Sequence, residues 1–167
     1  MFFFACGEDD DFSSINIGTE KMAGADAVIH SFEAHGYSSE HPIWHLRSKE
    51  AYIFQKDGLT HVFGVNIDYY GSDGKVSTFI KGEKGLLDKN KGTMRIEGNV
   101  EVVSQNGKKL TSDYLIWFDK EKKLKTDAPV RIETPEGDII RGRSLIADQK
   151  LDKLVLNAAT GISRPRD

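Results

Sequence analysis

The stretch MRIEGNVEVV, residues 94–103, decides the fold class of this chain. Apolar and charged residues alternate over its first four positions, and the same pattern returns in VRIE at residues 130–133. A period of two places the apolar side chains on one face of a β-strand and the charged ones on the other. We therefore expect strands whose apolar faces line a core or groove, and no long helix.

Turn signals of two kinds alternate along the chain. Charged turns are expected at residues 88–92, 119–123 and 148–153, and glycine turns are expected at Asp57-Gly58, Asp73-Gly74, Asn106-Gly107 and Glu136-Gly137. Gly98, Ala128 and Ala158 stand thirty residues apart, so the repeating unit is two strands and two turns. Strands joined by tight turns pair antiparallel, which predicts an antiparallel meander.

The alternation changes phase inside two of the expected strands. Leu110 and Leu115 are five residues apart, and the same offset separates Ile140 from Leu145. Residues that share one face of a strand are separated by even numbers. A bulge or bend within each strand would restore a single apolar face.

Composition predicts one folded domain. The chain has 167 residues, of which 38% are hydrophobic, enough for one core. We expect this domain over residues 27–160. A truncated signal with a lipobox and a flexible acidic tether are expected over residues 1–26, and a tail over 161–167. With 23 basic and 26 acidic residues and a net charge of -3, no broad basic surface is available, so nucleic acid is not an expected partner.

The first residues are similar to the end of a bacterial lipoprotein signal. Met1 to Gly7 reads as an apolar segment, a small residue and the single cysteine, Cys6. We expect Cys6 to be lipidated, so that the chain contacts a membrane only through this anchor; the alternative is a stray thiol in a mobile tail. Past the first few residues, no apolar run of the roughly 18 residues that a membrane-spanning helix requires occurs.

No catalytic or cofactor-binding motif is found. His30, His35, His41 and His45 fall close together, yet only a helix would bring His41 and His45 to one face, and Pro42 lies between them. Surface positions on early strands are expected for these histidines, and no metal or other cofactor. Phosphate-binding loops and nucleophile elbows are absent from the sequence, so an enzyme is not expected.

Several short segments together resemble the LptC-like family of lipopolysaccharide transport. They follow the family's order on the thirty-residue period over about residues 32–157, and comprise Trp44-His45-Leu46, Gly98 to Val102, Leu110 to Asp113, Leu115-Ile116-Trp117 and Thr126 to Val130. The resemblance implies a twisted, open β-jelly roll, two antiparallel sheets folded like a taco around an apolar slot. LptC-like proteins usually begin with a transmembrane helix, and the possible lipid anchor at Cys6 departs from that pattern.

By the same resemblance, the chain is a periplasmic, inner-membrane-anchored component of lipopolysaccharide export. It would take the acyl chains of lipopolysaccharide or a related glycolipid from an ABC transporter and pass them to an LptA-like bridge protein. The slot-facing residues expected are Trp44, Leu46, Met94, Ile96, Val100, Val102, Leu115, Trp117, Val130 and Ile132. The amino-terminal edge would dock on the permease subunits through Val28, His30 and Phe32, and the carboxy-terminal edge on the bridge protein through Leu154, Val155 and Leu156.

Other readings of the sequence remain open. The ten slot residues could instead form a closed, dry core with no ligand. The chain could be an LptA-like bridge protein, an envelope lipoprotein that carries another lipid, or a structural β module without a ligand. A cupin-like enzyme would need histidines on its inner face, where apolar residues are expected.

Overall fold

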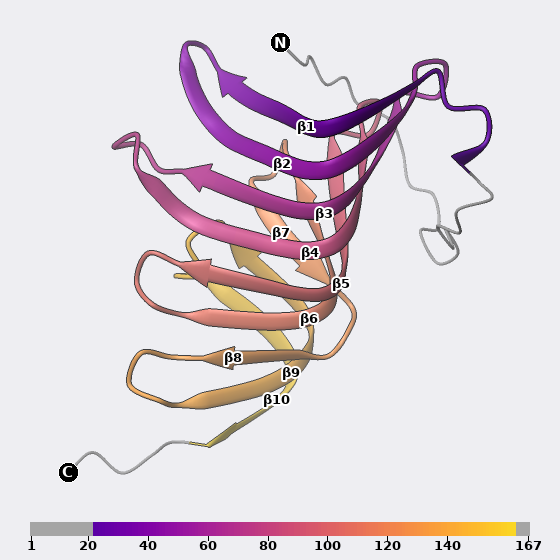
Figure 1. The fold of residues 1–167 in the computed structure, drawn as a ribbon. Coiled ribbons are helices and arrows are strands. Elements are labelled where there is room, and N and C mark those ends of the chain that lie inside the picture. The colour runs from indigo at the N-terminus through magenta and orange to yellow at the C-terminus, as the bar shows by residue number, and fades with distance from the viewer. Residues whose placement is uncertain (1–21, 163–167) are drawn as a thin grey trace.

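The computed structural model describes residues 22–162, in which ten strands form one antiparallel sheet. The strands are β1 (Ala27–Ser38), β2 (His41–Phe54), β3 (Leu59–Tyr70), β4 (Val76–Asp88), β5 (Thr93–Ser104), β6 (Lys109–Phe118), β7 (Lys123–Thr126), β8 (Val130–Glu133), β9 (Ile139–Asp148) and β10 (Leu154–Ile162). They follow one another across the sheet in chain order, so β1 and β10 lie at opposite ends (Figure 1). The predicted all-β meander is confirmed. Within residues 22–162 there is no helix with the length and apolar character needed to cross a membrane.

Most strands bend near their middle, and the bends align into a crease that folds the sheet in two (Figure 1). At the bend, buried positions change phase by three residues, from Ser48 to Ala51 in β2 and from Val62 to Val65 in β3. Backbone torsions mark the same line, because φ is positive at Ser31, Gly64, Gly98, Ser144 and Ala158. The bends predicted in β6 and β9 are confirmed as parts of this crease.

The crease breaks one strand completely, into β7 and β8. Both pieces pair with β6 and β9. β7 pairs with the carboxy-terminal halves of these two strands, and β8 pairs with their amino-terminal halves. Pro129 stands at the break and has no N–H to offer a ladder. The two expected sheets are thus two layers of one continuous sheet, one on each side of the crease. We call the layer that contains β7 the β7 layer and the layer that contains β8 the β8 layer.

The turns sit at the far ends of the two layers. The predicted glycine turns form, since Gly58, Gly74, Gly107 and Gly137 have positive φ and each donates its N–H to the carbonyl three residues earlier. Asp88 and Asp148, sixty residues apart, play equivalent parts in the charged turns. Each Oδ1 accepts two backbone N–H groups of its own turn. These turns close the β7 layer, whereas those at Gly74, Gly107 and Gly137 close the β8 layer.

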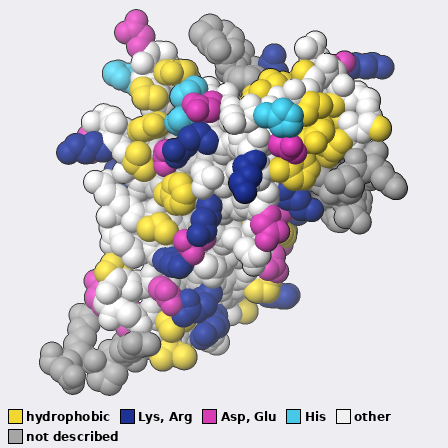
Figure 2. Space-filling model, in the orientation of Figure 1, with side chains coloured by type: hydrophobic (Ala, Val, Ile, Leu, Met, Phe, Trp, Pro, Cys, Tyr) yellow, Lys and Arg dark blue, Asp and Glu magenta, His cyan; other side chains and the backbone are white. Residues whose placement is uncertain are grey.

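Opposite charges are interspersed on the outer face of the β8 layer (Figure 2). Glu101 of β5 lies between Lys81 and Lys109 on the neighbouring strands, with its carboxylate oxygens 3.5 Å and 2.7 Å from their Nζ atoms. The hydrogen bond from Lys109 lowers the pKa of Glu101. Burial opposes this effect, and the positive charges of both lysines add to it. The outer face is therefore polar while the inner face is apolar, as the alternation predicts.

Candidate functional site

The inner faces of the two layers line one apolar interior. All ten residues expected to face the slot lie in it, and none is more than 3% exposed. They come from both layers: Trp44, Leu46, Val100, Val102, Val130 and Ile132 from the β8 layer, and Met94, Ile96, Leu115 and Trp117 from the β7 layer. The structure therefore brings together the whole set that the sequence singled out.

The side chains of this interior are closely packed around Trp44 and Trp117. The void bordered by Trp44, Met94 and Trp117 measures about 10 Å³. Such a space holds at most about one water molecule. The ten residues are buried against one another, so an acyl chain could lie among them only if the two layers moved apart.

Unsatisfied polar atoms gather at the mouth of the interior, the side opposite the crease. Tyr69 Oη, Thr93 Oγ1 and Trp117 Nε1 are buried and have no hydrogen-bond partner within residues 22–162. The Tyr69 and Trp117 rings are 4.8 Å apart, and Thr93 borders the same small void as Trp117. Burial raises the pKa of Tyr69 well above its usual range, and the nearby Asp119 carboxylate raises it further. Because buried polar groups are usually paired, these three can hydrogen-bond an incoming polar group.

The mouth is closed by the turn between β9 and β10, residues 148–153, which we call the latch turn. Gln149 Nε2 donates to Tyr70 O at 3.1 Å and to Ser77 Oγ at 2.9 Å, and Thr78 Oγ1 donates to Gln149 O at 2.6 Å. Lys108 Nζ donates to the carbonyl oxygen of Leu151 at 2.8 Å. Each of these bonds between the layers involves a side chain, whereas continuous strands join the layers at the crease. The mouth can thus open without breaking a backbone ladder.

β1 and β10 are the two edges of the sheet, and neither pairs with a further strand within residues 22–162. Val28 is 50% exposed and Val155 is 62% exposed, and His30 is also exposed. The Phe32 side chain is buried in the core, while Leu154 and Leu156 pack partly against it. Phe32 can therefore offer a partner only its backbone.

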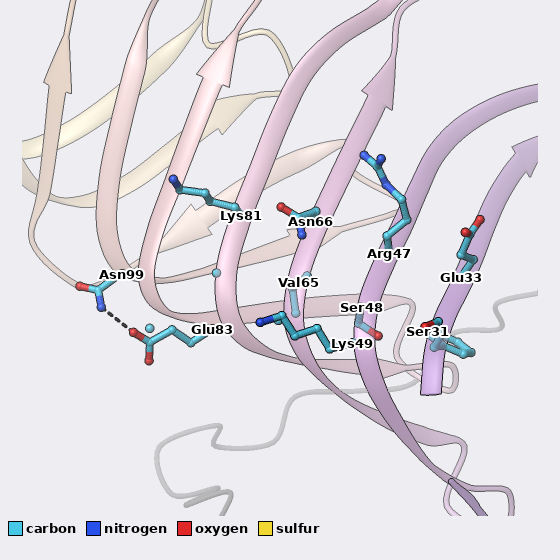
Figure 3. A pocket seen from close by; sticks show the side chains of 14 residues that line it. Ser31, Glu33, Arg47, Ser48, Lys49, Val65, Asn66, Lys81, Glu83 and Asn99 are labelled. Carbon is cyan, nitrogen blue, oxygen red and sulfur yellow. Dashed lines mark hydrogen bonds between the residues drawn. The ribbon is translucent and has the colours of Figure 1, made fainter. Parts of the chain in front are cut away.

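The crease also forms a pocket on the outer surface, which the sequence did not indicate. Its volume is about 480 Å³, and Figure 3 shows Arg47, Lys49, Lys81, Glu83 and Asn99 along it. Asn99 Nδ2 donates to Glu83 Oε1 at 2.6 Å. Only two of the bends appear as phase changes in the sequence. A pocket that depends on the alignment of several bends therefore could not be predicted from the sequence.

A model of the family described as lipopolysaccharide-assembly, LptC-related proteins matches residues 3–162. The chain belongs to this family. The LptC-related match spans the whole folded sheet and confirms the family resemblance of the short motifs.

A solved structure also resembles this LptC-related chain. It is the crystal structure of LptH, the LptA-homologous periplasmic component of the lipopolysaccharide transport device of Pseudomonas aeruginosa. The TM-score is 0.56 at 17% sequence identity, and the alignment covers 75% of this chain and 97% of LptH. At this identity the likeness shows a shared fold, the LptA-like β-jelly roll. A comparison with curated proteins found no significant match.

Cys6 and the other residues before Met22 lie outside the described part of the LptC-related chain. Backbone pairing begins just before β1, where the N–H of Asp26 donates to Ile53 O at 2.8 Å. At the other end, β10 reaches Ile162, two residues into the expected tail. The lipid anchor and the tether stay predictions.

One histidine cluster in the LptC-related chain is not evident from spacing along the sequence. His30, His35 and His41 are exposed as expected, but the rings of His35 and His45 stack at 4.1 Å. Neither helical spacing nor a His-x-His pattern relates these two residues, which face each other across a hairpin. Pairing the two strands around the turn at residues 39–40 would have revealed them.

Proposed function

We propose that this chain is a non-enzymatic, periplasmic component of lipopolysaccharide export that holds glycolipid acyl chains between its two layers. One observation carries the proposal: the apolar lining is continuous from β1 at one edge to β9 and β10 at the other. A sheet whose two edge strands are unpaired can be extended by a similar module on either side. Membership of the lipopolysaccharide-assembly family supports the choice of ligand.

Entry of an acyl chain requires the layers to part about the crease. The latch bonds each contribute about 1 kcal/mol, because folding exchanges them for bonds to water. Burying a methylene group gains about 0.8 kcal/mol, so about ten methylenes gain about 8 kcal/mol. A lipid that replaces the lost contacts between the layers can therefore offset the free-energy cost of opening the latch.

The polar atoms at the mouth suit the linkage between the acyl chains and the headgroup of such a lipid. Acyl chains join a glycolipid headgroup through ester or amide carbonyls, which accept hydrogen bonds. Tyr69 Oη, Thr93 Oγ1 and Trp117 Nε1 can donate to these carbonyls once the layers separate. We infer that the acyl chains lie deep between the layers and the headgroup lies near the latch turn.

Transfer along the transport route would use the two sheet edges. β1, with Val28 and His30 outward, would pair with periplasmic domains of the permease subunits, and β10, with Val155, with an LptA-like bridge protein. Successive modules would offer similar apolar walls, so passage between them would be nearly balanced in free energy. Direction would then come from the ATP-driven transporter, and Cys6 would anchor the chain to the inner membrane.

Photo-crosslinking tests the groove. A photoreactive amino acid at Ile96 or Ile132 should label lipopolysaccharide, whereas the same residue at Arg131, next to Ile132 on the outer face, should not. Equal labelling from positions 131 and 132 would contradict a groove between the layers. Purified protein that retains no extractable lipid and shows no labelling from either inner position would favour the closed core.

The fold shared with LptH favours a second candidate, an LptA-like bridge protein. Bridge proteins of this kind would join head to tail, with β10 of one copy paired to β1 of the next. Light scattering over a range of protein concentrations separates the two functions. Concentration-dependent linear oligomers would favour the bridge, and a monomer that binds permease domains would favour the transporter-bound role.

A further inference from the structure

We propose that Glu33, His35 and His45 form a binding site for a divalent transition metal on the outer face of the β1–β2 hairpin. One ligand atom from each side chain lies within 4.8 Å of the other two. The site is separate from the groove, because these side chains point away from the buried Phe32 and Ala34 of the same strand. A metal at this site would not require a lipid in the groove.

The hairpin register brings the three ligands together. His35 on β1 is paired directly with His45 on β2, and Glu33 is two residues from His35 on the same strand. Side chains paired across antiparallel strands have Cβ atoms about 4.5–5.5 Å apart, which suits a shared ligand. Two histidines on a rigid sheet are held more precisely than two on a loop.

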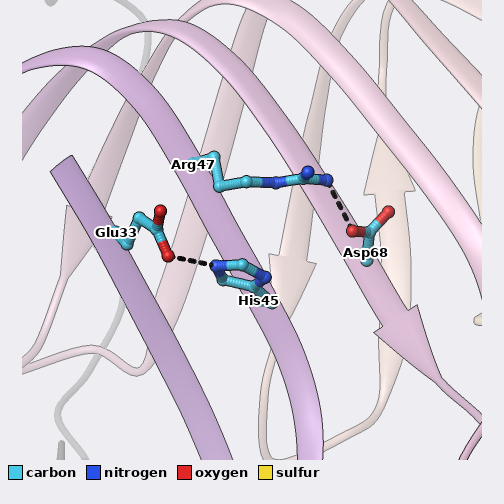
Figure 4. Close-up of polar contacts among 4 residues, drawn as sticks. All are labelled: Glu33, His45, Arg47 and Asp68. Carbon is cyan, nitrogen blue, oxygen red and sulfur yellow. Dashed lines mark hydrogen bonds and ion pairs between the residues drawn. The ribbon is translucent and has the colours of Figure 1, made fainter. Parts of the chain in front are cut away.

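Neighbouring charges leave the Glu33 carboxylate available to a metal. Its direct partner across the hairpin is Arg47, but the guanidinium of Arg47 pairs with Asp68 of β3 (Figure 4). Glu33 Oε2 instead lies 2.9 Å from His45 Nε2. The carboxylate is thus directed at the imidazole, and the guanidinium of its partner across the hairpin is already paired with Asp68.

Two imidazoles and one carboxylate suit zinc and similar metals. Zinc sites with three protein ligands complete a tetrahedron with water, whereas magnesium and calcium prefer all-oxygen ligands. The His35 and His45 rings now stack with an interplanar angle of 10°, so side-chain rotation must bring their nitrogens to a common point. Glu33 and His35 are exposed, which leaves room on the solvent side for this rotation. The metal would replace the bond between Glu33 and His45.

Calorimetric titration of the tag-free chain with zinc chloride tests the site. After removal of metals with EDTA, the wild type should bind one zinc ion that magnesium chloride does not displace. His35→Ala and His45→Ala should each weaken zinc binding at least about tenfold, the loss seen even when residues that only support a ligand are removed. His30→Ala is the matched control, because His30 lies on the same strand and pairs with Glu50 instead.

Cobalt(II) gives a second readout. Bound in place of zinc, it should show the strong visible absorption of a tetrahedral complex, lost in the His35 and His45 variants. Zinc binding unchanged in both variants, or weakened as much by His30→Ala, would overturn the proposal. Circular dichroism shows whether each variant is folded, so that a loss of binding can be assigned to the missing side chain. Lipid labelling from Ile96 should not depend on zinc.

Discussion

Gln149 Nε2 lies 2.9 Å from Ser77 Oγ, a contact that joins the latch turn of the β7 layer to the first residues of β4 in the β8 layer. The two residues are 72 positions apart in the sequence. Gln149 bonds a second group of the β8 layer, the carbonyl of Tyr70, through the same nitrogen. One side chain thus ties together two layers that the backbone connects only along the crease.

Gln149→Ala should lower the free energy of unfolding by about 1–2 kcal/mol, because two hydrogen bonds in a partly buried place are lost. If the latch limits entry, lipid labelling from Ile96 should rise at the same time. Urea unfolding and photo-crosslinking measure the two effects. Gln105→Ala, an exposed glutamine in a turn of the β8 layer, should change stability by less than about 0.5 kcal/mol. A stability loss without increased labelling would show that the latch does not control access.

Gly36→Ala should destabilise the sheet by about 1–3 kcal/mol. A Cβ at Gly36 would overlap the indole of Trp44, which is buried on the neighbouring strand and cannot easily move. The shift in the urea midpoint measures this cost. Gly161→Ala on β10 is the control, because its Cβ would meet nothing closer than Ile139 O at 3.9 Å. If both variants unfold at the same urea concentration, Trp44 does not pack against Gly36.

Stability should fall on acidification through the range in which Glu101 takes up a proton. The hydrogen bond from Lys109 lowers the folded-state pKa of Glu101 below its value in the unfolded chain. Its contribution is therefore complete above the unfolded value, about 4.3, and is lost as pH falls through the lowered pKa. Glu101→Gln should reduce stability at pH 7 and have a smaller effect at about pH 3. Urea unfolding at both pH values measures the difference, and equal effects would exclude this linkage.

Glu136→Gln serves as the control for that experiment. Glu136 is exposed in the turn between β8 and β9. Its variant should follow the wild type at both pH values, because surface substitutions of this kind change stability little.

Tyr69→Phe should leave the free energy of unfolding unchanged or raise it by up to about 1 kcal/mol. The Tyr69 hydroxyl is buried with no partner among residues 22–162. Removing it therefore removes the free-energy cost of burying an unpaired polar group. Tyr114→Phe should instead lose about 1 kcal/mol, because Tyr114 Oη accepts the N–H of Asp127. Urea unfolding compares the two. A clear loss in Tyr69→Phe would mean that a water molecule or another group satisfies the hydroxyl.

Local patterns were enough to predict the strands, the turns and the inner face. The alternation at residues 94–97 and 130–133 assigns Ile96 and Ile132 to the interior, because a strand has a period of two wherever it lies. Gly107 and Gly137 marked turns because positive φ is easy only for glycine. Each of these inferences depends on a few consecutive residues, and the structure bears them out.

Contacts between distant residues could be decided only by the folded sheet. The phase change between Leu110 and Leu115 indicated a bend, but not that bends in neighbouring strands align into a crease. The bonds of Gln149 to the β8 layer depend on how the sheet folds over, and the meeting of His35 and His45 depends on strand register. Whether the apolar interior is open or filled depends on side-chain volumes summed across both layers. No short stretch of sequence determines this total volume. In the structure, the space that remains next to Trp44 and Trp117 is about 10 Å³.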